Sequence, residues 1–176
     1  GLGGLSAAIS LAQSGYDVTI FDKNGQIGGK LNELKADGYT FDLGPSILTL
    51  PDLFRRLFER SGKLMEDYFS IRPLRPPWRN FFEDGTVVDL YPEPDRMAEE
   101  LAKVGEAPAD FQKFLDYSGE IYDLVNEGYF EEGLDTAEDF RNHYGLWRFP
   151  KFDLLRTMHQ SVARHVKTRY MRDILD

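Results

Sequence analysis

The stretch GLGGLSAAISLAQSGYDVTIFDKNGQIGGK, residues 1–30, decides the fold of this chain. It matches the second half of a dinucleotide-binding fingerprint, in which a glycine loop leads into a helix, expected over 5–14, and then a strand, expected over 16–22. Gly1 and Gly4 fit the second and third glycines of G-x-G-x-x-G, which let a pyrophosphate approach the backbone and the helix pack on the sheet. Gly15 then ends the helix. The pattern predicts an α/β fold with a Rossmann-like dinucleotide-binding domain.

The fingerprint is incomplete at its beginning, because its first strand and first glycine would precede Gly1. We therefore expect the chain to be an N-terminally truncated fragment of a longer protein. The phosphates of a dinucleotide would face the beginning of the helix, where free backbone N–H groups and the helix dipole favour an anion.

Asp22 and the glycines after it extend the predicted site. An acidic residue about 20 positions after the glycine loop, at the end of the second strand, accepts hydrogen bonds from the adenosine ribose. The alternative is an aspartate that serves the following turn. Residues 22–30, DKNGQIGGK, add Gly28, Gly29 and the cation Lys30, which favour a second contact with the diphosphate. A plain tight turn is the alternative for this glycine pair.

Composition excludes several classes of function. The chain has 176 residues, a formal net charge of −9 and a pI near 4.9, which argue against nucleic acid as a partner. The absence of cysteine excludes disulfides and thiolate metal sites and fits a cytoplasmic protein. His143, His159 and His165 lack zinc-ligand spacing, so no metal is expected. No apolar run approaches the roughly 20 residues that span a bilayer, so any membrane contact is expected to be peripheral.

Turn signals and apolar periodicity predict the remaining elements. Two hairpins are expected, one over 31–48 turning at Asp37–Gly38 and one over 79–92 turning at Asp84–Gly85. The pattern also predicts helix over 51–62 and most of 94–127, a turn over 128–136, and helical segments approaching residue 143 and over 152–175.

A change of character near residue 94 suggests two regions. Residues 1–93 form the dinucleotide-binding region with its hairpins, and residues 94–176 form the start of a mostly helical region on the substrate and membrane side. Residues 156–172 are basic within an acidic chain, which suits a solvated helix face or an anionic lipid surface. Large aromatic residues at helical or strand spacing are assigned to the core: Phe54, Phe58, Trp78, Phe81, Phe82 and Trp147.

Three strings carry a resemblance to a known family: GLGGLSAA at 1–8, VTIFDKNGQIGGK at 18–30 and GYTFDLGPSILT at 38–49. Together they resemble the N-terminal region of the bacterial-type phytoene desaturase family of FAD-dependent carotenoid desaturases and oxygenases. Later strings resemble its C30 branch: SILTLPDLF at 46–54, PPWRNFFEDGTVVDLY at 76–91 and GYFEEGLDT at 128–136.

This resemblance implies FAD as the cofactor, an acyclic C30 carotenoid as the apolar polyene substrate, and peripheral attachment to the membrane. It implies oxidation of a terminal methyl group, or desaturation, by hydride transfer to flavin. Asp22 stands where the family usually has glutamate. The residues that the resemblance assigns to FAD binding are Gly1, Leu2, Gly3, Gly4, Asp22, Lys23, Gly29, Lys30, Gly44, Pro45 and Ser46.

The resemblance does not identify a catalytic acid or base. Asp42 is a candidate, although an aspartate at a strand end beside Gly44 more often has a structural role. The fragment alone is expected to be inactive. Two alternatives stay open: an amine oxidase-like flavoprotein, which shares the glycine elements, and a non-catalytic nucleotide-binding module.

Overall fold

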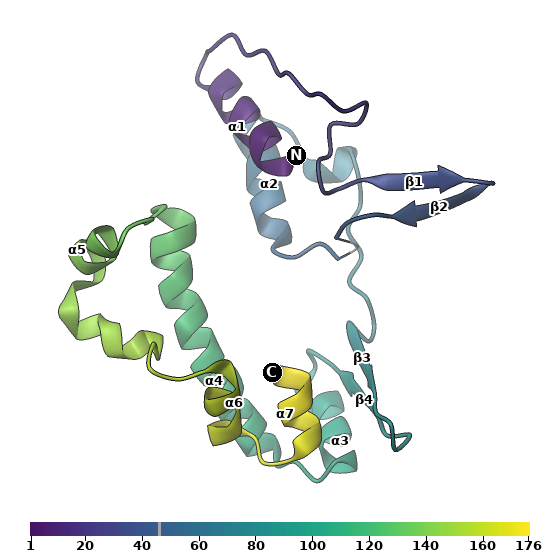
Figure 1. Ribbon diagram of the computed structural model, residues 1–176, viewed down its shortest axis with the longest axis vertical. Helices are drawn as coiled ribbons and strands as arrows, with labels where there is room; N and C mark the ends of the chain where they lie inside the picture. The colour runs from purple at the N-terminus through teal and green to yellow at the C-terminus, as the bar shows by residue number, and fades with distance from the viewer. Residues whose placement is uncertain (46) are drawn as a thin grey trace. The chain divides into compact units, whose positions relative to one another are not determined.

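The computed structural model describes residues 1–45 and 47–176 and divides the chain into two compact units, Gly1–Arg72 and Pro73–Asp176 (Figure 1). Each unit combines helices with a small antiparallel hairpin, so the predicted mixed α/β class is confirmed. The unit boundary lies before the second hairpin rather than near residue 94, because that hairpin packs against the helix that follows it. The functional division at residue 94 stays a prediction.

The first unit begins with helix α1, Leu2–Gln13. The chain leaves the helix at Gly15, whose φ of 86° lies in the left-handed region that favours glycine. The predicted helix is thus confirmed, although it begins at Leu2 and includes the loop glycines in its first turn. Gln13 Nε2 donates a hydrogen bond of 2.5 Å to Ser61 Oγ, which links α1 to the end of helix α2, Pro51–Arg60.

Residues 16–22 do not form the predicted strand. A strand requires a neighbouring strand as hydrogen-bond partner. In the described part of the chain the paired strands belong to the two local hairpins, so residues 16–22 have no such partner. Their apolar sequence suits a strand buried on both faces, but without the adjoining strands the Phe21 side chain is 92% exposed.

The first hairpin is confirmed with its predicted turn. Strand β1, Glu33–Ala36, pairs with strand β2, Tyr39–Asp42, and the turn residues Asp37 and Gly38 have φ of 51° and 81°. Two positive φ values in a two-residue loop define the turn type that matches the twist of a hairpin. Figure 1 shows this hairpin projecting away from α1 and α2 within the first unit.

Helix α2 is also confirmed, with Pro51 in its first turn and Gly62 after its end. Phe58 packs against the rings of Tyr68 and Phe69, at centroid distances of 5.1 and 5.8 Å. The 3-10 helix η1, Met65–Asp67, completes the unit, and its Met65 is buried.

The second unit starts with the hairpin of strands β3, Trp78–Phe81, and β4, Val87–Leu90, which turns at Asp84–Gly85 as predicted. Helices α3, Pro94–Lys103, and α4, Pro108–Val125, follow in the predicted helical region. The main core joins this hairpin and these helices to the C-terminal helices: Val88, Met97, Leu101, Val104, Phe111, Val162, Val166 and Met171.

A polar network links the second hairpin to helix α3. Arg79 makes two hydrogen bonds of 2.8 Å to the carboxylate of Asp89, and this contact holds the pKa of Asp89 below its usual range. The backbone N–H of Asp89 donates to Glu100 on α3, which also pairs with Lys103. The network therefore fixes β4 on α3.

The segment predicted as a turn over 128–136 instead begins with a π-helix, η2, Asn126–Glu131. The Tyr144 hydroxyl donates to the carbonyl of Leu124 and lies close to Gly128. In a regular α-helix that carbonyl would accept from the N–H of Gly128 instead. A Cβ on Gly128 would lie 2.1 Å from that hydroxyl oxygen, so only glycine leaves room for it. The inserted hydroxyl explains the wider helix.

The C-terminal part consists of helix α5, Ala137–Arg148, the 3-10 helix η3, Phe149–Phe152, and helices α6, Met158–His165, and α7, Arg169–Leu175. The single region predicted over 152–175 is thus two helices. The buried carboxylate of Glu106 accepts hydrogen bonds from the backbone N–H groups of Lys167 and Thr168 and from the Thr168 hydroxyl. These bonds satisfy donors at the beginning of α7 and separate it from α6.

Three of the predicted core aromatics are exposed: Trp78, Phe81 and Trp147. Phe54, Phe58 and Phe82 are half-buried. Periodicity identifies apolar positions but does not say which of them another element covers. Within the second unit, Trp78, Phe81 and Trp147 lack such a cover.

Candidate dinucleotide-binding site

Two glycine elements that are far apart in the sequence meet at the beginning of α1. Gly29 has a φ of 64°, and a Cβ on it would lie 2.7 Å from Gly1 Cα and 3.2 Å from Gly1 N. A Cβ on Gly1 would in turn lie 3.7 Å from Gly29 Cα. We call residues 1–4 together with 28–30 the glycine junction. Its backbones approach so closely that a side chain at Gly29 would force the two segments apart.

The first turn of α1 offers donors that no side chain caps. The N–H of Leu5 bonds the carbonyl of Gly1, so the N–H groups before it have no partner within the helix. Gly1 occupies the cap position without a side-chain hydrogen bond, and the first turn contains no acidic residue. Gly1, Leu2, Gly3 and Gly4 are all exposed. An anion can therefore reach these N–H groups and the positive end of the helix dipole.

The third predicted segment, which contains Gly44 and Pro45, lies against the second, residues 28–30. A Cβ on Gly44 would be 1.7 Å from the carbonyl oxygen of Lys30, so glycine is required where the two backbones meet. The N–H of Leu43 donates to the carbonyl of Asn32 at 2.8 Å and holds the segments in register. Pro45 follows this contact, whereas the predicted site residue Ser46 lies outside the described residues.

A cavity of about 350 Å³ opens beside the glycine junction. Its wall contains Gly28, Leu31 and Pro45. Its polar lining consists of Gln26 and, at the hairpin, Asn32, Glu33 and Asp42. The volume is at the lower end of the range for small-molecule pockets, so the cavity has room for part of a dinucleotide.

Asp22 and Lys23 lie in the turn that follows the predicted strand. Asp22 Oδ1 accepts hydrogen bonds from the backbone N–H of Asn24 at 2.9 Å and from its side-chain amide at 3.1 Å. The carboxylate thus serves the local turn that the sequence offered as the alternative to ribose binding. Both bonds use the same oxygen. Asp22 and Lys23 are exposed, as is Lys30 at the glycine junction.

The sequence pointed to Gly28 and Asp42, but not to the other polar residues that line the cavity, Gln26, Asn32 and Glu33. A Cβ on Gly28 would lie 1.9 Å from the carbonyl oxygen of Leu31, so this glycine is needed for the fold of the turn itself. The sequence did contain a signal for this lining. If the strand pairing is extended outward from the predicted turn, Asn32 pairs with Leu43 and Gly44 lies beside Leu31.

Membrane-spanning helices and metal-holding side-chain groups are both absent from the described residues, 1–45 and 47–176. No helix in this range combines the length and apolar character that a bilayer crossing requires. No group of three or more His, Cys, Asp or Glu side chains in it is arranged to hold a metal ion.

Known proteins resemble both the region that contains the glycine junction and the chain as a whole. Residues 1–61 match the family model of the NAD(P)-binding Rossmann-like domain. The whole chain is 48% identical to 4,4'-diapolycopene oxygenase of a Methylomonas species, of which it covers 36%. Over 99% of its length it is 44% and 42% identical to 4,4'-diaponeurosporene oxygenases of Staphylococcus haemolyticus and Staphylococcus aureus, and it covers 35% and 36% of them. The chain thus spans about a third of the length of these curated relatives.

Proposed function

We propose, from the premise that this chain belongs to the same family as the diapocarotenoid oxygenases it matches, that the full-length protein is an FAD-dependent oxidoreductase of acyclic C30 carotenoids. The observation that carries the proposal is the glycine junction, where the backbone of Gly29 contacts that of Gly1 at the uncapped beginning of α1. This junction lies within the region that matches the Rossmann-like dinucleotide-binding family.

The junction fits a diphosphate. A diphosphate needs several N–H donors and a backbone free of side chains, and residues 1–4 supply both at the positive end of a helix dipole. Gly29 supports this surface from the other side, and Lys30 adds a positive charge next to it. We assign Gly1, Leu2, Gly3 and Gly4 to the first phosphate contact.

The remaining residues of the site are assigned to the ribose and to the flavin ring of FAD. The free oxygen of Asp22 accepts a ribose hydroxyl while the other oxygen keeps its bonds to Asn24, and Lys23 lies next to this carboxylate. Gly44 and Pro45 take the position beside the flavin ring, and the close backbone contact of Gly44 with Lys30 sets that position. Ser46 is assigned to the flavin by the resemblance alone.

When bound, FAD would accept a hydride from an activated C–H bond; the carbon would then take oxygen from water when a methyl group is oxidised, or lose a neighbouring proton in a desaturation. The residues of this chain bind and orient the cofactor. The names of the relatives favour an oxygenase over a desaturase, and they favour a carotenoid over an amine as substrate. Since such a polyene partitions into the bilayer, we also propose that the protein acts while attached to the cytoplasmic face of the membrane.

The test is to purify the full-length protein, release its cofactor by heat and identify it by chromatography. Stoichiometric FAD supports the proposal. NAD or NADP in place of FAD would refute the cofactor assignment, and a preparation without nucleotide would favour the non-catalytic module. A Gly29→Val variant, which places a branched side chain against Gly1, should lose the flavin. The matched control is Gly25→Ala, because a Cβ on Gly25 meets no atom within 4 Å and the variant should retain the flavin.

A further inference from the structure

Asn24 and Gly25 lie in the turn that connects Asp22 to the glycine junction. Asn24 is the only one of the five asparagines in the chain that precedes a glycine. The backbone nitrogen of the next residue can attack an asparagine side chain, and a glycine in that position has no side chain to obstruct the attack. The pair is therefore a candidate site of covalent modification that needs no enzyme.

The local structure leaves both reacting groups accessible. Asn24 and Gly25 are exposed, and a Cβ built on Gly25 meets no atom within 4 Å. In the part of the chain that the structure describes, no backbone carbonyl accepts a hydrogen bond from the N–H of Gly25. No backbone hydrogen bond therefore has to break before the Gly25 nitrogen approaches the Asn24 side chain.

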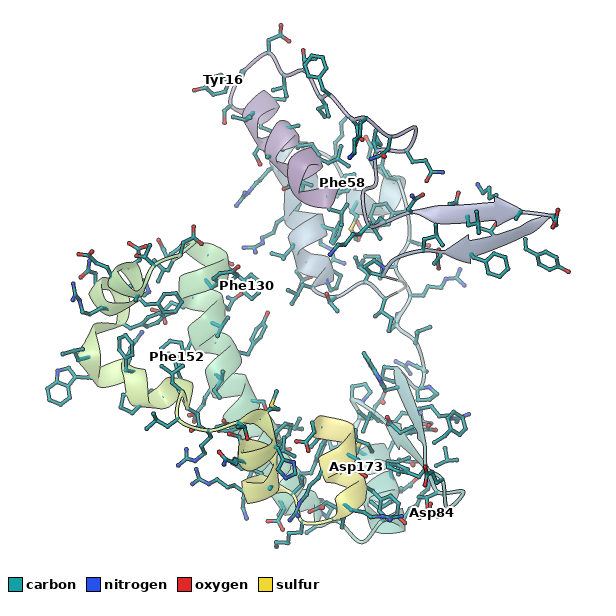
Figure 2. The ribbon with its side chains drawn as sticks, viewed as in Figure 1. Tyr16, Phe58, Asp84, Phe130, Phe152 and Asp173 are labelled. Atoms are coloured by element: carbon teal, nitrogen blue, oxygen red, sulfur yellow. The ribbon has the colours of Figure 1, made fainter. Side chains whose placement is uncertain are left out.

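The Asp84–Gly85 turn of the second hairpin has a similar sequence but is held in place. The N–H of Gly85 donates to a backbone carbonyl at 3.0 Å. Asp84, labelled in Figure 2, accepts from the N–H of Thr86 through one oxygen and from the Tyr170 hydroxyl through the other. An ionised carboxylate is also a poorer electrophile than an amide. The comparison therefore favours Asn24 as the reactive position.

The reaction consumes only water. The nitrogen of Gly25 attacks Cγ of Asn24, the new C–N bond closes a succinimide ring, and the Cγ–Nδ2 bond breaks. Nδ2 leaves as ammonia and takes the proton that the Gly25 N–H gives up. Water then adds to one of the two ring carbonyls. Opening at Cγ leaves an aspartate, and opening at the former backbone carbonyl leaves an isoaspartate, in which the main chain runs through Cγ.

Both products disturb the surroundings of Asp22. The Asn24 side-chain amide donates to Asp22 Oδ1 at 3.1 Å, whereas a carboxylate at position 24 has no proton to donate and repels Asp22. The isoaspartate also lengthens the chain between Asp22 and Gly29 by one carbon, or about 1.5 Å. Gly29 must stay against Gly1 to keep the glycine junction, so the added length falls on the turn that holds Asp22.

We propose that Asn24 converts spontaneously to aspartate and isoaspartate, and that this conversion weakens dinucleotide binding at the glycine junction. The chemical step follows from the turn alone. Its effect on affinity rests on the proposed function, because that function makes FAD the dinucleotide and Asp22 its ribose acceptor.

The experiment incubates the full-length protein at mildly alkaline pH and compares tryptic peptides with those of an unincubated sample. Conversion adds about 1 Da to the peptide of residues 24–30, and coelution with a synthetic isoaspartyl peptide identifies the product. This peptide should convert at least about tenfold faster than the peptides that contain the other asparagines, and Gly25→Ala should slow it at least about tenfold. Equal rates at all asparagines, or an unchanged rate in Gly25→Ala, would overturn the proposal.

The affinity for FAD gives the second readout. The converted protein can be separated by ion exchange through its added negative charge, and it should bind FAD at least about fivefold more weakly. The matched control Asn24→Ala cannot convert and should keep its affinity through the same incubation. Unchanged affinity of the converted protein would overturn the effect on the site. Freshly prepared protein that binds no FAD would count against the proposed function, and the peptide masses would still decide the conversion.

Discussion

The substitution Gly29→Ala tests the glycine junction through two separable effects. The first is conformational, because alanine at a φ of 64° costs about 1–2 kcal/mol relative to glycine. The second is steric, because the new Cβ would lie 2.7 Å from Gly1 Cα, and overpacking of this kind costs about 1–3 kcal/mol. In the variant without FAD, we expect the turn at residues 28–30 to move away from Gly1 and so relieve the overlap. FAD binding must bring this turn back against Gly1, so the steric cost lowers the affinity for FAD.

The expected result is a loss of FAD affinity of about 1–3 kcal/mol, or roughly 5- to 150-fold. The assay is titration of the flavin-free full-length protein with FAD, followed by the change in flavin fluorescence. Gly38→Ala is the matched control, because Gly38 has a φ of 81° but a Cβ on it meets no atom within 4 Å. This variant should lose stability to urea by about 1–2 kcal/mol and bind FAD normally. Equal FAD affinities for Gly29→Ala and Gly38→Ala would refute the reasoning.

Three further predictions follow from single contacts. Asp22→Ala should weaken FAD binding by about 1–3 kcal/mol through loss of the ribose acceptor. Asn24→Ala should not, because it removes only the side-chain amide that bonds Asp22 and keeps the backbone N–H bond. Equal flavin titrations for both variants would contradict the role of Asp22. The pKa of Asp89 is lowered chiefly by its hydrogen bond from Arg79, so its contribution to stability is complete above its usual value of 3.8 and is lost as pH falls through the lowered pKa. Urea unfolding at a series of acidic pH values should show this loss, and Asp89→Asn should abolish that part of the pH dependence. Gly128→Ala should destabilise the protein in thermal unfolding, because its Cβ would meet the Tyr144 hydroxyl at 2.1 Å. The control Gly119→Ala, in open space on α4, should stabilise the protein by about 0.5–1 kcal/mol. The reverse order of stabilities would refute the insertion of the Tyr144 hydroxyl as the cause of the π-helix.

Local signals predicted the elements that local interactions form. The turns at Asp37–Gly38 and Asp84–Gly85 and the helix that begins at Pro51 are found where the sequence places them. Each depends on residues close together in the chain, such as a glycine with positive φ or a proline in a first helical turn. The glycine motifs predicted which backbone segments form a candidate site, because glycine is required where backbones meet.

Elements that depend on distant partners were not predictable in the same way. Residues 16–22 have the composition of a buried strand, but strand formation depends on neighbouring strands that the described residues do not supply. The π-helix at 126–131 depends on the Tyr144 hydroxyl, and the separation of α6 from α7 depends on Glu106, which lies far away in the sequence. Exposure of Trp147 likewise depends on which face is covered, and apolar periodicity does not contain that information.

The most direct test of the account is the visible spectrum of the full-length protein, recorded in detergent without oxygen before and after addition of an acyclic C30 polyene. We expect a flavin spectrum that bleaches when the polyene is added, because the substrate transfers a hydride to the bound flavin. A flavin spectrum that the polyene leaves unchanged would contradict the proposed substrate, and a colourless protein would contradict the proposed cofactor.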